Sequence, residues 1–168
     1  MKSKNIIYLA TGYAKIENYK NITYNDLIVR RDLVCDMLAV DLSNFDIIIA
    51  SPPCNYWSKA NYRREASEYS QKTKHLLPEI LQKLTALNKP FIVENVINKK
   101  LMGNIIKNFK GFYYEHGRHC YFTNVMFNPS GIYQKKEYIE QISTKKRQGG
   151  ENVNIIIEHF LDTVSPGN

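Results

Sequence analysis

The sequence lacks the features that mark a membrane, secreted or repeat protein. No hydrophobic run approaches the roughly 20 residues that a membrane-spanning helix needs. The first residues, MKSKNIIYLATGYAK, hold too short an apolar run for a signal peptide and no clear cleavage site. Internal repeats and low-complexity linkers are also absent. We therefore expect one globular domain over residues 1–168, in the cytoplasm and without membrane contact.

Cysteine is scarce, and its spacing excludes two common uses. The chain has 3 cysteines, Cys35, Cys54 and Cys120, and no C-x-x-C pair. An odd and unevenly spaced set predicts neither a disulfide framework nor a zinc site, so we expect no bound metal.

Acidic residues are fewer than basic ones. The chain has 23 Lys and Arg against 16 Asp and Glu, which gives a formal net charge of +7. A basic surface suits a polyanionic partner, and nucleic acid first. A solvated, lysine-rich surface would explain the same balance without any partner, so charge alone favours nucleic acid only weakly.

Hydrophobic patterning predicts an α/β fold. Apolar runs predict strands at 5–10, 30–36, 45–50 and 90–96, and two more within 111–127 that are joined by a turn at Gly117. Helical spacing predicts helices over 66–87, with a kink or a restart at Pro78, and over 101–109, 135–143 and 152–163. This alternation indicates a single-domain, mostly parallel open sheet, with 45–50 central and 90–96 beside it.

A thiol directly follows the most apolar strand. Ligands of open α/β sheets bind at the carboxyl ends of the strands, which is where Cys54 lies. Pro52 and Pro53 restrict the loop, and a thiolate held there is a strong nucleophile. A buried cysteine that only fills space is the alternative. The polar residues that follow, including Arg63 and Arg64, are not core sequence, and basic neighbours favour the thiolate.

Two further polar groups accompany predicted strands. Glu94 and Asn95 end the strand at 90–96, and a glutamate in a buried strand must find a partner or stay protonated. An arginine or a helix N-terminus that holds the carboxylate would be a purely structural explanation. Arg118 lies between two histidines beside an aromatic strand, where it could equally line the surface of a sheet edge.

Together these segments resemble the DNA cytosine-5 methyltransferase family. ASPPCNYWS is similar to the Pro-Cys nucleophile loop of the family, and IVENV to its Glu-Asn-Val motif. HGRHCYFTN is similar to its arginine motif, Gln-x-Arg-x-Arg in most members and Arg-His-Arg in many small phage forms. CDMLAVDLSNFDIIIASPPC resembles the approach to the loop, and order and spacing agree over residues 32–127. The resemblance implies a small, phage-like member with a reduced Rossmann-like methyltransferase fold.

The resemblance also implies a mechanism. The base is flipped out of double-stranded DNA, and a thiolate adds to cytosine C6, so that C5 can attack the methyl group of S-adenosylmethionine. The implied catalytic residues are Cys54 as nucleophile, Glu94 at N3 and the exocyclic amine, Asn95 orienting the loop, and Arg118 holding the base or its phosphate. Those implied for DNA phosphates are Ser58, Arg63 and Arg64. Those implied for the methyl donor are Gly12, Asp36 and Pro52.

The chain departs from the family pattern near its N-terminus and in the third motif. The family's Phe-x-Gly-x-Gly turn is reduced to Gly12. About twenty residues separate it from 30–36, too few for the usual helix plus a second strand with an acidic ribose ligand. Cys120 replaces the second arginine of the third motif, and we expect neither a separate target-recognition domain nor the family's closing segment. A second chain or a homodimer could complete this donor site.

Three interpretations follow. The first is an active, small cytosine-5 methyltransferase with a diverged donor site. The second is a degenerate or split-subunit homologue that binds DNA or cytosine without methylating on its own. In the third, SPPC is a diverged form of the Asp/Asn-Pro-Pro-aromatic loop of amino-methyltransferases. That loop needs no thiol, and the third interpretation gives IVENV no role.

Overall fold

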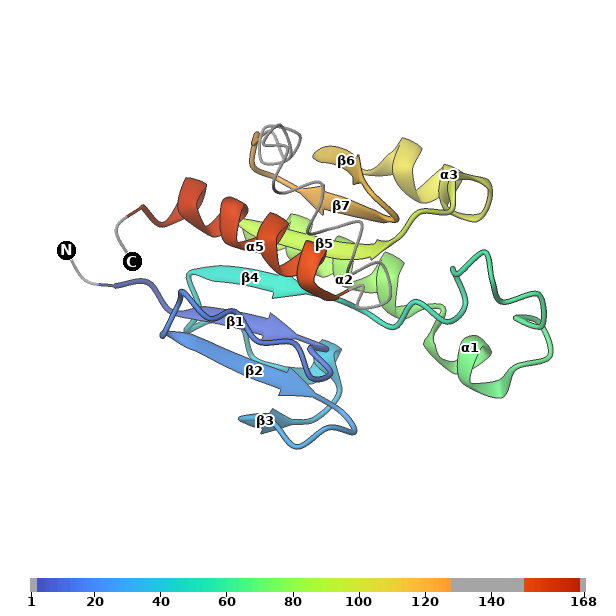
Figure 1. Ribbon diagram of the computed structural model, residues 1–168, viewed down its shortest axis with the longest axis horizontal. Helices are drawn as coiled ribbons and strands as arrows, with labels where there is room; N and C mark the ends of the chain where they lie inside the picture. Colours follow the sequence, from blue (N-terminus) through green and yellow to red (C-terminus); the bar gives the residue numbers. More distant parts are fainter. Residues whose placement is uncertain (1–2, 128–149, 167–168) are drawn as a thin grey trace.

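The protein is built on one mixed β-sheet. A computed structural model describes residues 3–127 and 150–166. Within these residues the sheet has seven strands in the order β3-β2-β1-β4-β5-β7-β6 (Figure 1). The strands are β1 Ile6–Leu9, β2 Ile22–Asp26, β3 Leu33–Val34, β4 Ile47–Ala50, β5 Phe91–Val96, β6 Phe112–His116 and β7 His119–Thr123. The five strands from β3 to β5 are parallel, while β7 is antiparallel to both β5 and β6.

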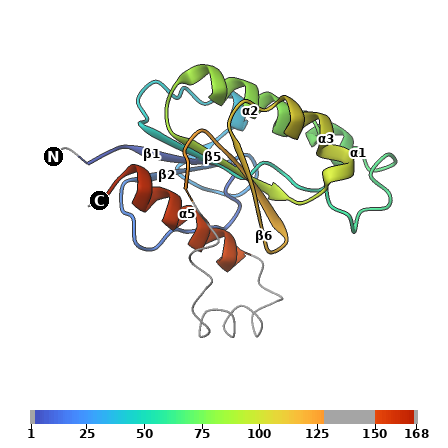
Figure 2. The same ribbon diagram turned by 90° about the horizontal axis from the view of Figure 1, so that it is seen from above.

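Helices cover both faces of this sheet. One face carries η1 (Met37–Ala39), α2 (Leu76–Leu87) and α3 (Lys99–Asn108), and the other carries α5 (Gly150–Val164) (Figure 2). The short α1 (Glu68–Thr73) lies beyond the carboxyl end of β4. None of the helices in the described part of the chain combines the length and apolar character needed to cross a bilayer.

Most of the predicted elements are confirmed. The strand at 45–50 becomes β4, the central strand, and the strand at 90–96 becomes β5, its parallel neighbour. The two strands within 111–127 form a hairpin with Gly117 at φ +60° in its turn, a conformation that glycine adopts without strain. The predicted helix at 66–87 divides into α1 and α2, with Pro78 in the first turn of α2, where no backbone hydrogen bond is lost. The predicted helix at 135–143 lies outside the described residues.

The sequence did not predict the strand that pairs with β1 on the side away from β4. The strand beside β1 is β2, whereas the predicted strand at 30–36 contributes only the two-residue, exposed β3. The sequence of β2, ITYND, carries little hydrophobic signal because one of its two buried positions is occupied by Asn25. The Asn25 amide accepts a hydrogen bond from the backbone N–H of Ala10 and donates to the carbonyls of Leu33 and Cys35. The spacing was expected to be too short for a helix plus a second strand with an acidic end. The strand with its acidic end is present as β2, which ends at Asp26.

No helix lies between β1 and β2 in the described chain, in agreement with the short spacing there. Ile16 and Tyr19 of the intervening loop instead pack under α5 in one apolar cluster. Arg31 holds this loop by donating to the Ala14 carbonyl at 2.7 Å, and its guanidinium lies 4.4 Å from the centre of the Tyr24 ring. Tyr19 also donates to Asp162 on α5. A C-terminal helix thus closes the face that the N-terminal loop leaves open.

Truncating the buried side of α5 should destabilise the whole fold. Ile157 is fully buried in the cluster under α5, so Ile157→Ala should lower the free energy of unfolding by about 2–5 kcal/mol. Ile155, on the same helix but outside that cluster, is the control, and Ile155→Ala should cost less than about 1 kcal/mol. Urea unfolding followed by circular dichroism measures both, and equal losses would show that α5 does not dock through Ile157.

Candidate active site

The predicted nucleophile and the predicted carboxylate share one edge of the sheet. β4 and β5 are parallel and in register, with Ala50 opposite Val93. The next residue of each strand is therefore Ser51 and Glu94, and the chain leaves β4 at this edge toward α1 (Figure 1). Cys54 follows three residues later and is exposed. Cys54 and Glu94 therefore lie at the same edge of the sheet, as the predicted mechanism requires.

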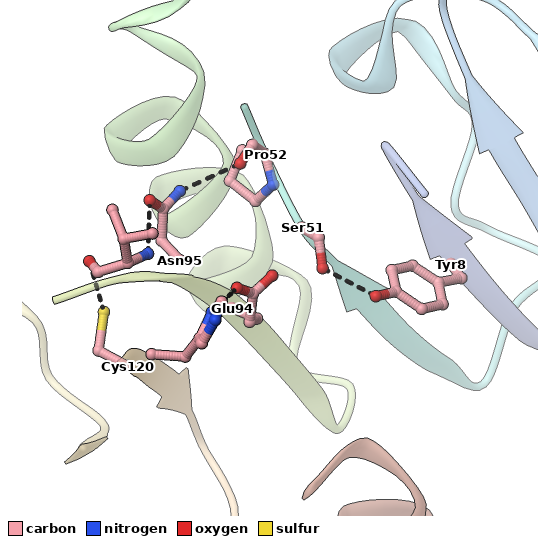
Figure 3. A network of polar contacts seen from close by, with 8 residues as sticks. Tyr8, Ser51, Pro52, Glu94, Asn95 and Cys120 are labelled. Atoms are coloured by element: carbon pink, nitrogen blue, oxygen red, sulfur yellow. Dashed lines mark hydrogen bonds and ion pairs between the residues drawn. The ribbon is translucent and has the colours of Figure 1, made fainter. Parts of the chain in front are cut away.

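Asn95 fixes the start of the loop that carries Cys54. Its buried side-chain amide donates to the Pro52 carbonyl at 3.1 Å, and its side-chain oxygen accepts from the backbone N–H of Val96 at 2.8 Å (Figure 3). After Pro52 the chain turns at Cys54, whose carbonyl accepts from the N–H groups of Trp57 and Ser58 at 3.0 and 2.9 Å. Cys54 therefore begins a tight turn whose entry is held from the neighbouring strand.

Asn98 holds the far end of that turn and was missed by the sequence analysis. Its side-chain amide donates to the Trp57 carbonyl at 2.8 Å, and its side-chain oxygen caps α3 by accepting from Leu101 N–H. The indole of Trp57 is buried in the core cluster on the α2–α3 face. An asparagine three residues before an apolar helical residue is a capping signal, and it was the available clue.

The two arginines predicted to contact phosphates occupy different environments. Arg64 is half-buried and donates to the carbonyls of Tyr56 and Ser58, both at 2.8 Å, so its guanidinium supports the loop itself. Arg63 is exposed and lies over the ring of Tyr62, 5.7 Å from its centre. Ser58 is half-buried, with its carbonyl held by Arg64. Of the two arginines, only Arg63 points its charge at solvent.

Glu94 is paired with His119 rather than with an arginine. Nδ1 of His119 lies 2.7 Å from Oε1 of Glu94, and the side chains are only 21% and 12% exposed. Nearby, Tyr8 of β1 shares a 2.9 Å hydrogen bond with the hydroxyl of Ser51 (Figure 3). Burial and, secondly, the charge of Glu94 raise the pKa of the Tyr8 phenol. Sequence analysis did not single out His119, Tyr8 or Ser51, because their roles depend on cross-strand neighbours.

The third motif divides between two faces of the sheet. Arg118 is exposed in the β6–β7 turn, and its carbonyl accepts from the N–H of Ile97. Cys120, at the position of the family's second arginine, is buried in the α2–α3 cluster and donates to the Val96 carbonyl at 3.4 Å. Its burial raises the pKa of this thiol to about 12. His119 lies between them in sequence and on the opposite face from Cys120.

The Cys54 thiol is not activated in the structure as it stands. Burial of the sulfur, and next the negative charge of Glu94, raise the pKa of Cys54 above its ordinary value. The expectation that basic neighbours favour the thiolate is therefore wrong, because Arg64 is engaged with backbone carbonyls and the nearby charge is acidic. The raised pKa of Cys54 thus follows first from the burial of the sulfur and then from the carboxylate beside it.

A cavity of about 230 Å³ lies beside the loop, at the ends of β1 and β2. Asp36 and Pro53 line it together with Ala10 and Asp26, whereas Gly12 and Pro52 are not among the described residues of its wall. Ala10 has φ +53°, a left-handed conformation that is strained for a residue with a side chain. Of the three residues predicted for the methyl donor, the structure brings Asp36 to the cavity wall.

Asp26 is the acidic residue at the end of β2 that the sequence analysis did not find. Its carboxylate accepts from the backbone N–H groups of Gly12, Ile28 and Val29 at 2.8–3.0 Å. Burial is the largest single influence and opposes ionisation, but these hydrogen bonds outweigh it and hold the pKa of Asp26 below its usual range. Gly12 thus contributes to the cavity indirectly, by fixing this carboxylate.

Comparison with known proteins matches the sequence of this chain to a family. The family described as C-5 cytosine-specific DNA methylase matches residues 5–161. A relative from Methanocaldococcus jannaschii, named "Putative type II methyltransferase M.MjaORF1200P", is 28% identical over 155 residues. The aligned part covers 76% of this chain and 42% of that protein, so the chain spans less than half the length of this relative. With its mostly parallel sheet and with Cys54 and Glu94 at one edge, the chain belongs to the C-5 cytosine-specific DNA methylase family.

Proposed function

We propose that this chain methylates cytosine at C5 in double-stranded DNA, through a covalent adduct at Cys54 and with S-adenosylmethionine as the methyl donor. The observation that carries the proposal is the shared sheet edge, where Asn95 of the Glu-Asn-Val motif holds the loop of the nucleophile beside Glu94. The family match supports the same reaction. The amino-methyltransferase alternative leaves this contact between the two motifs without a purpose.

The chemistry at the base belongs to Cys54 and Glu94. The thiolate forms a bond to C6, the C5–C6 π pair moves into the ring, and the Glu94 carboxyl gives its proton to N3. S-adenosylmethionine, when bound, supplies the methyl group that C5 takes up. Loss of the C5 proton to water then expels the Cys54 thiolate, N3 returns its proton to Glu94, and the aromatic ring is restored. Breaking and restoring aromaticity in this way requires a positioned thiol, which a pure DNA-binding protein does not need.

The raised pKa of Cys54 fits a nucleophile that is activated by its substrate. While Glu94 is ionised, its charge disfavours the thiolate. A cytosine that accepts a hydrogen bond from Glu94, after this carboxylate has taken up a proton from water, leaves no negative charge beside the thiol. The second cause of the raised pKa of Cys54 is then removed, while burial, the first cause, remains.

The donor cavity fits the methyl donor in chemistry but is small. Asp26 and Asp36 provide carboxylate oxygens that can accept from hydroxyl or amine groups, as a nucleoside offers. Its volume of about 230 Å³ lies below the roughly 300–1,000 Å³ of common ligand pockets. This small size favours the second function, a homologue or split subunit that needs another chain to complete its donor site.

DNA contacts would surround the nucleophile loop. The exposed cations Lys59 and Arg63 lie in the loop itself, and the exposed Lys72 and Lys99, in α1 and α3, form ion pairs with Glu68 and Glu115. Such groups suit phosphates on either side of a flipped nucleotide. Arg64 keeps the loop in shape, so its replacement would act on the nucleophile as well as on DNA affinity.

The first prediction concerns the thiol. In a variant with Cys35→Ser and Cys120→Ser, the rate at which iodoacetamide modifies Cys54 is measured against pH. The pH of the half-maximal rate should lie above the value found for free cysteine. Glu94→Gln removes the negative charge that disfavours the thiolate, so its midpoint should move to lower pH. Glu115→Gln is the matched control, since Glu115 is paired with Lys99 and should leave the midpoint unchanged. An unmoved midpoint in Glu94→Gln would show that the two groups do not interact.

The second prediction tests the covalent step. Duplex DNA of mixed sequence that carries 5-fluorocytosine should trap the protein when S-adenosylmethionine is present, because fluorine cannot leave C5 as a cation. Cys54→Ser should abolish the adduct, while Cys35→Ser should retain it. Denaturing gel electrophoresis shows the adduct, and trapping that survives the loss of Cys54 would remove this residue from the mechanism.

The third prediction concerns the donor. The reduced turn at Gly12 offers fewer backbone N–H donors to S-adenosylmethionine than the family's glycine turn. A loss of two hydrogen bonds, at about 1 kcal/mol each, would weaken binding about thirtyfold relative to a complete site. Asp36→Asn keeps the helix cap but removes the charge from the cavity, and it should weaken calorimetric binding by a further factor of about ten. Asp41→Asn, which also accepts from a backbone N–H but lies outside the cavity wall, should not. Equal affinities for both variants would exclude Asp36 from the donor site.

Methyl transfer by the isolated chain should accordingly be slow. Tritiated methyl incorporation into mixed-sequence DNA should rise when a second chain or a second copy covers the edge near Gly12 and Asp36. Rapid turnover that persists on dilution would show that the donor site is complete in one chain.

A further inference from the structure

We infer that His119 is a positioning residue for Glu94, and that it determines which oxygen of the carboxyl group carries the proton. This inference rests on the proposed function. It is drawn from the cross-strand contact between Nδ1 and Oε1, at 2.7 Å, in a largely buried part of the sheet edge. It assigns to a histidine the place beside Glu94 that sequence comparison would give to an arginine.

The strand register explains why His119 reaches Glu94 and its neighbours do not. In the antiparallel β5–β7 pair, Glu94 lies directly opposite Tyr121. Side chains two residues apart on a strand share a face, so His119 lies diagonal to Glu94 on the same side of the sheet. Cys120 points to the other face, where its thiol donates to the Val96 carbonyl. Neither Cys120 nor a residue placed there on this register can meet the carboxyl group.

The direction of the hydrogen bond between His119 and Glu94 decides which oxygen of a protonated Glu94 carries the proton. When the His119 Nδ1–H donates to Oε1, the proton of the neutral carboxyl group must sit on Oε2. Oε2 is then the donor that can meet N3 of a cytosine, while Oε1 stays an acceptor. Without that bond the carboxylic acid can place its proton on either oxygen and rotate, and the productive arrangement becomes one among several.

Addition at C6 can be measured without the methyl donor. The result of this test therefore does not depend on whether the chain binds S-adenosylmethionine. The Sγ–C6 bond forms, the π pair reaches C5, and C5 takes a proton from water. Elimination then returns the thiolate and releases the original C5 hydrogen, so tritium at C5 passes into water. The assay is tritium release from duplex DNA labelled at cytosine C5, with protein in excess and no S-adenosylmethionine.

The variants separate a positioning role from a structural one. His119→Ala should slow tritium release at saturating DNA about a hundredfold, with DNA affinity, measured by fluorescence anisotropy, changed less than about twofold. His119→Asn places an amide N–H where Nδ1 was, and it should recover the rate to within about tenfold of the parent chain. Cys120→Ser, one residue away but on the opposite face, is the matched control and should release tritium at the parent rate.

A double variant tests whether His119 acts through Glu94. Glu94→Ala combined with His119→Ala should be no slower than Glu94→Ala alone, within about threefold, because alanine leaves no carboxyl oxygen for His119 to hold. Multiplying losses in the double variant, or an undiminished rate in His119→Ala, would overturn the inference while leaving the proposed function intact. An absence of Cys54-dependent tritium release from the parent chain would overturn both.

Discussion

The site depends on the parallel pairing of β4 and β5. Because the two strands run the same way and in register, their ends deliver Ser51 and Glu94 side by side, although 42 positions separate them in the sequence. The bond from Asn95 to the Pro52 carbonyl then joins the two loops. A buried amide left without that partner would cost about 1–3 kcal/mol, so the fold and the placement of the nucleophile are stabilised by the same contact.

Three polar side chains at this edge donate to backbone carbonyls of the loop that carries Cys54. Asn95, Asn98 and Arg64 each donate to carbonyls within residues 52–58, and between them they hold the beginning, the middle and the end of the Cys54 turn. A turn restrained at three points presents its thiol in one place. The charge beside that thiol is acidic, so the structure combines a fixed thiol with a pKa that burial and, secondly, the charge of Glu94 raise.

The edge around the cavity at the ends of β1 and β2, the proposed donor site, is built differently from the edge that carries Cys54. The loop after β1 has no helix to support it, and its cover comes from Ile16, Tyr19 and the distant α5. Its local order depends on Asp26, whose carboxylate gathers three backbone N–H groups around the cavity. Sequence analysis found Asp36 there and missed Asp26, because a five-residue strand with a buried asparagine has almost no hydrophobic signal.

The sequence by itself determined the elements with strong periodicity and the motifs that lie at their ends. Continuous apolar runs predicted β1, β4 and β5, and the rule that ligands meet parallel strands at their carboxyl ends was enough to group Cys54, Glu94 and Asn95. Only the tertiary structure decided that His119 rather than Arg118 or Cys120 meets Glu94, that Arg64 supports the loop, and that Cys54 has a raised pKa. Those outcomes depend on register, on which face a side chain takes, and on distances between charges, and none of these is encoded in local sequence spacing.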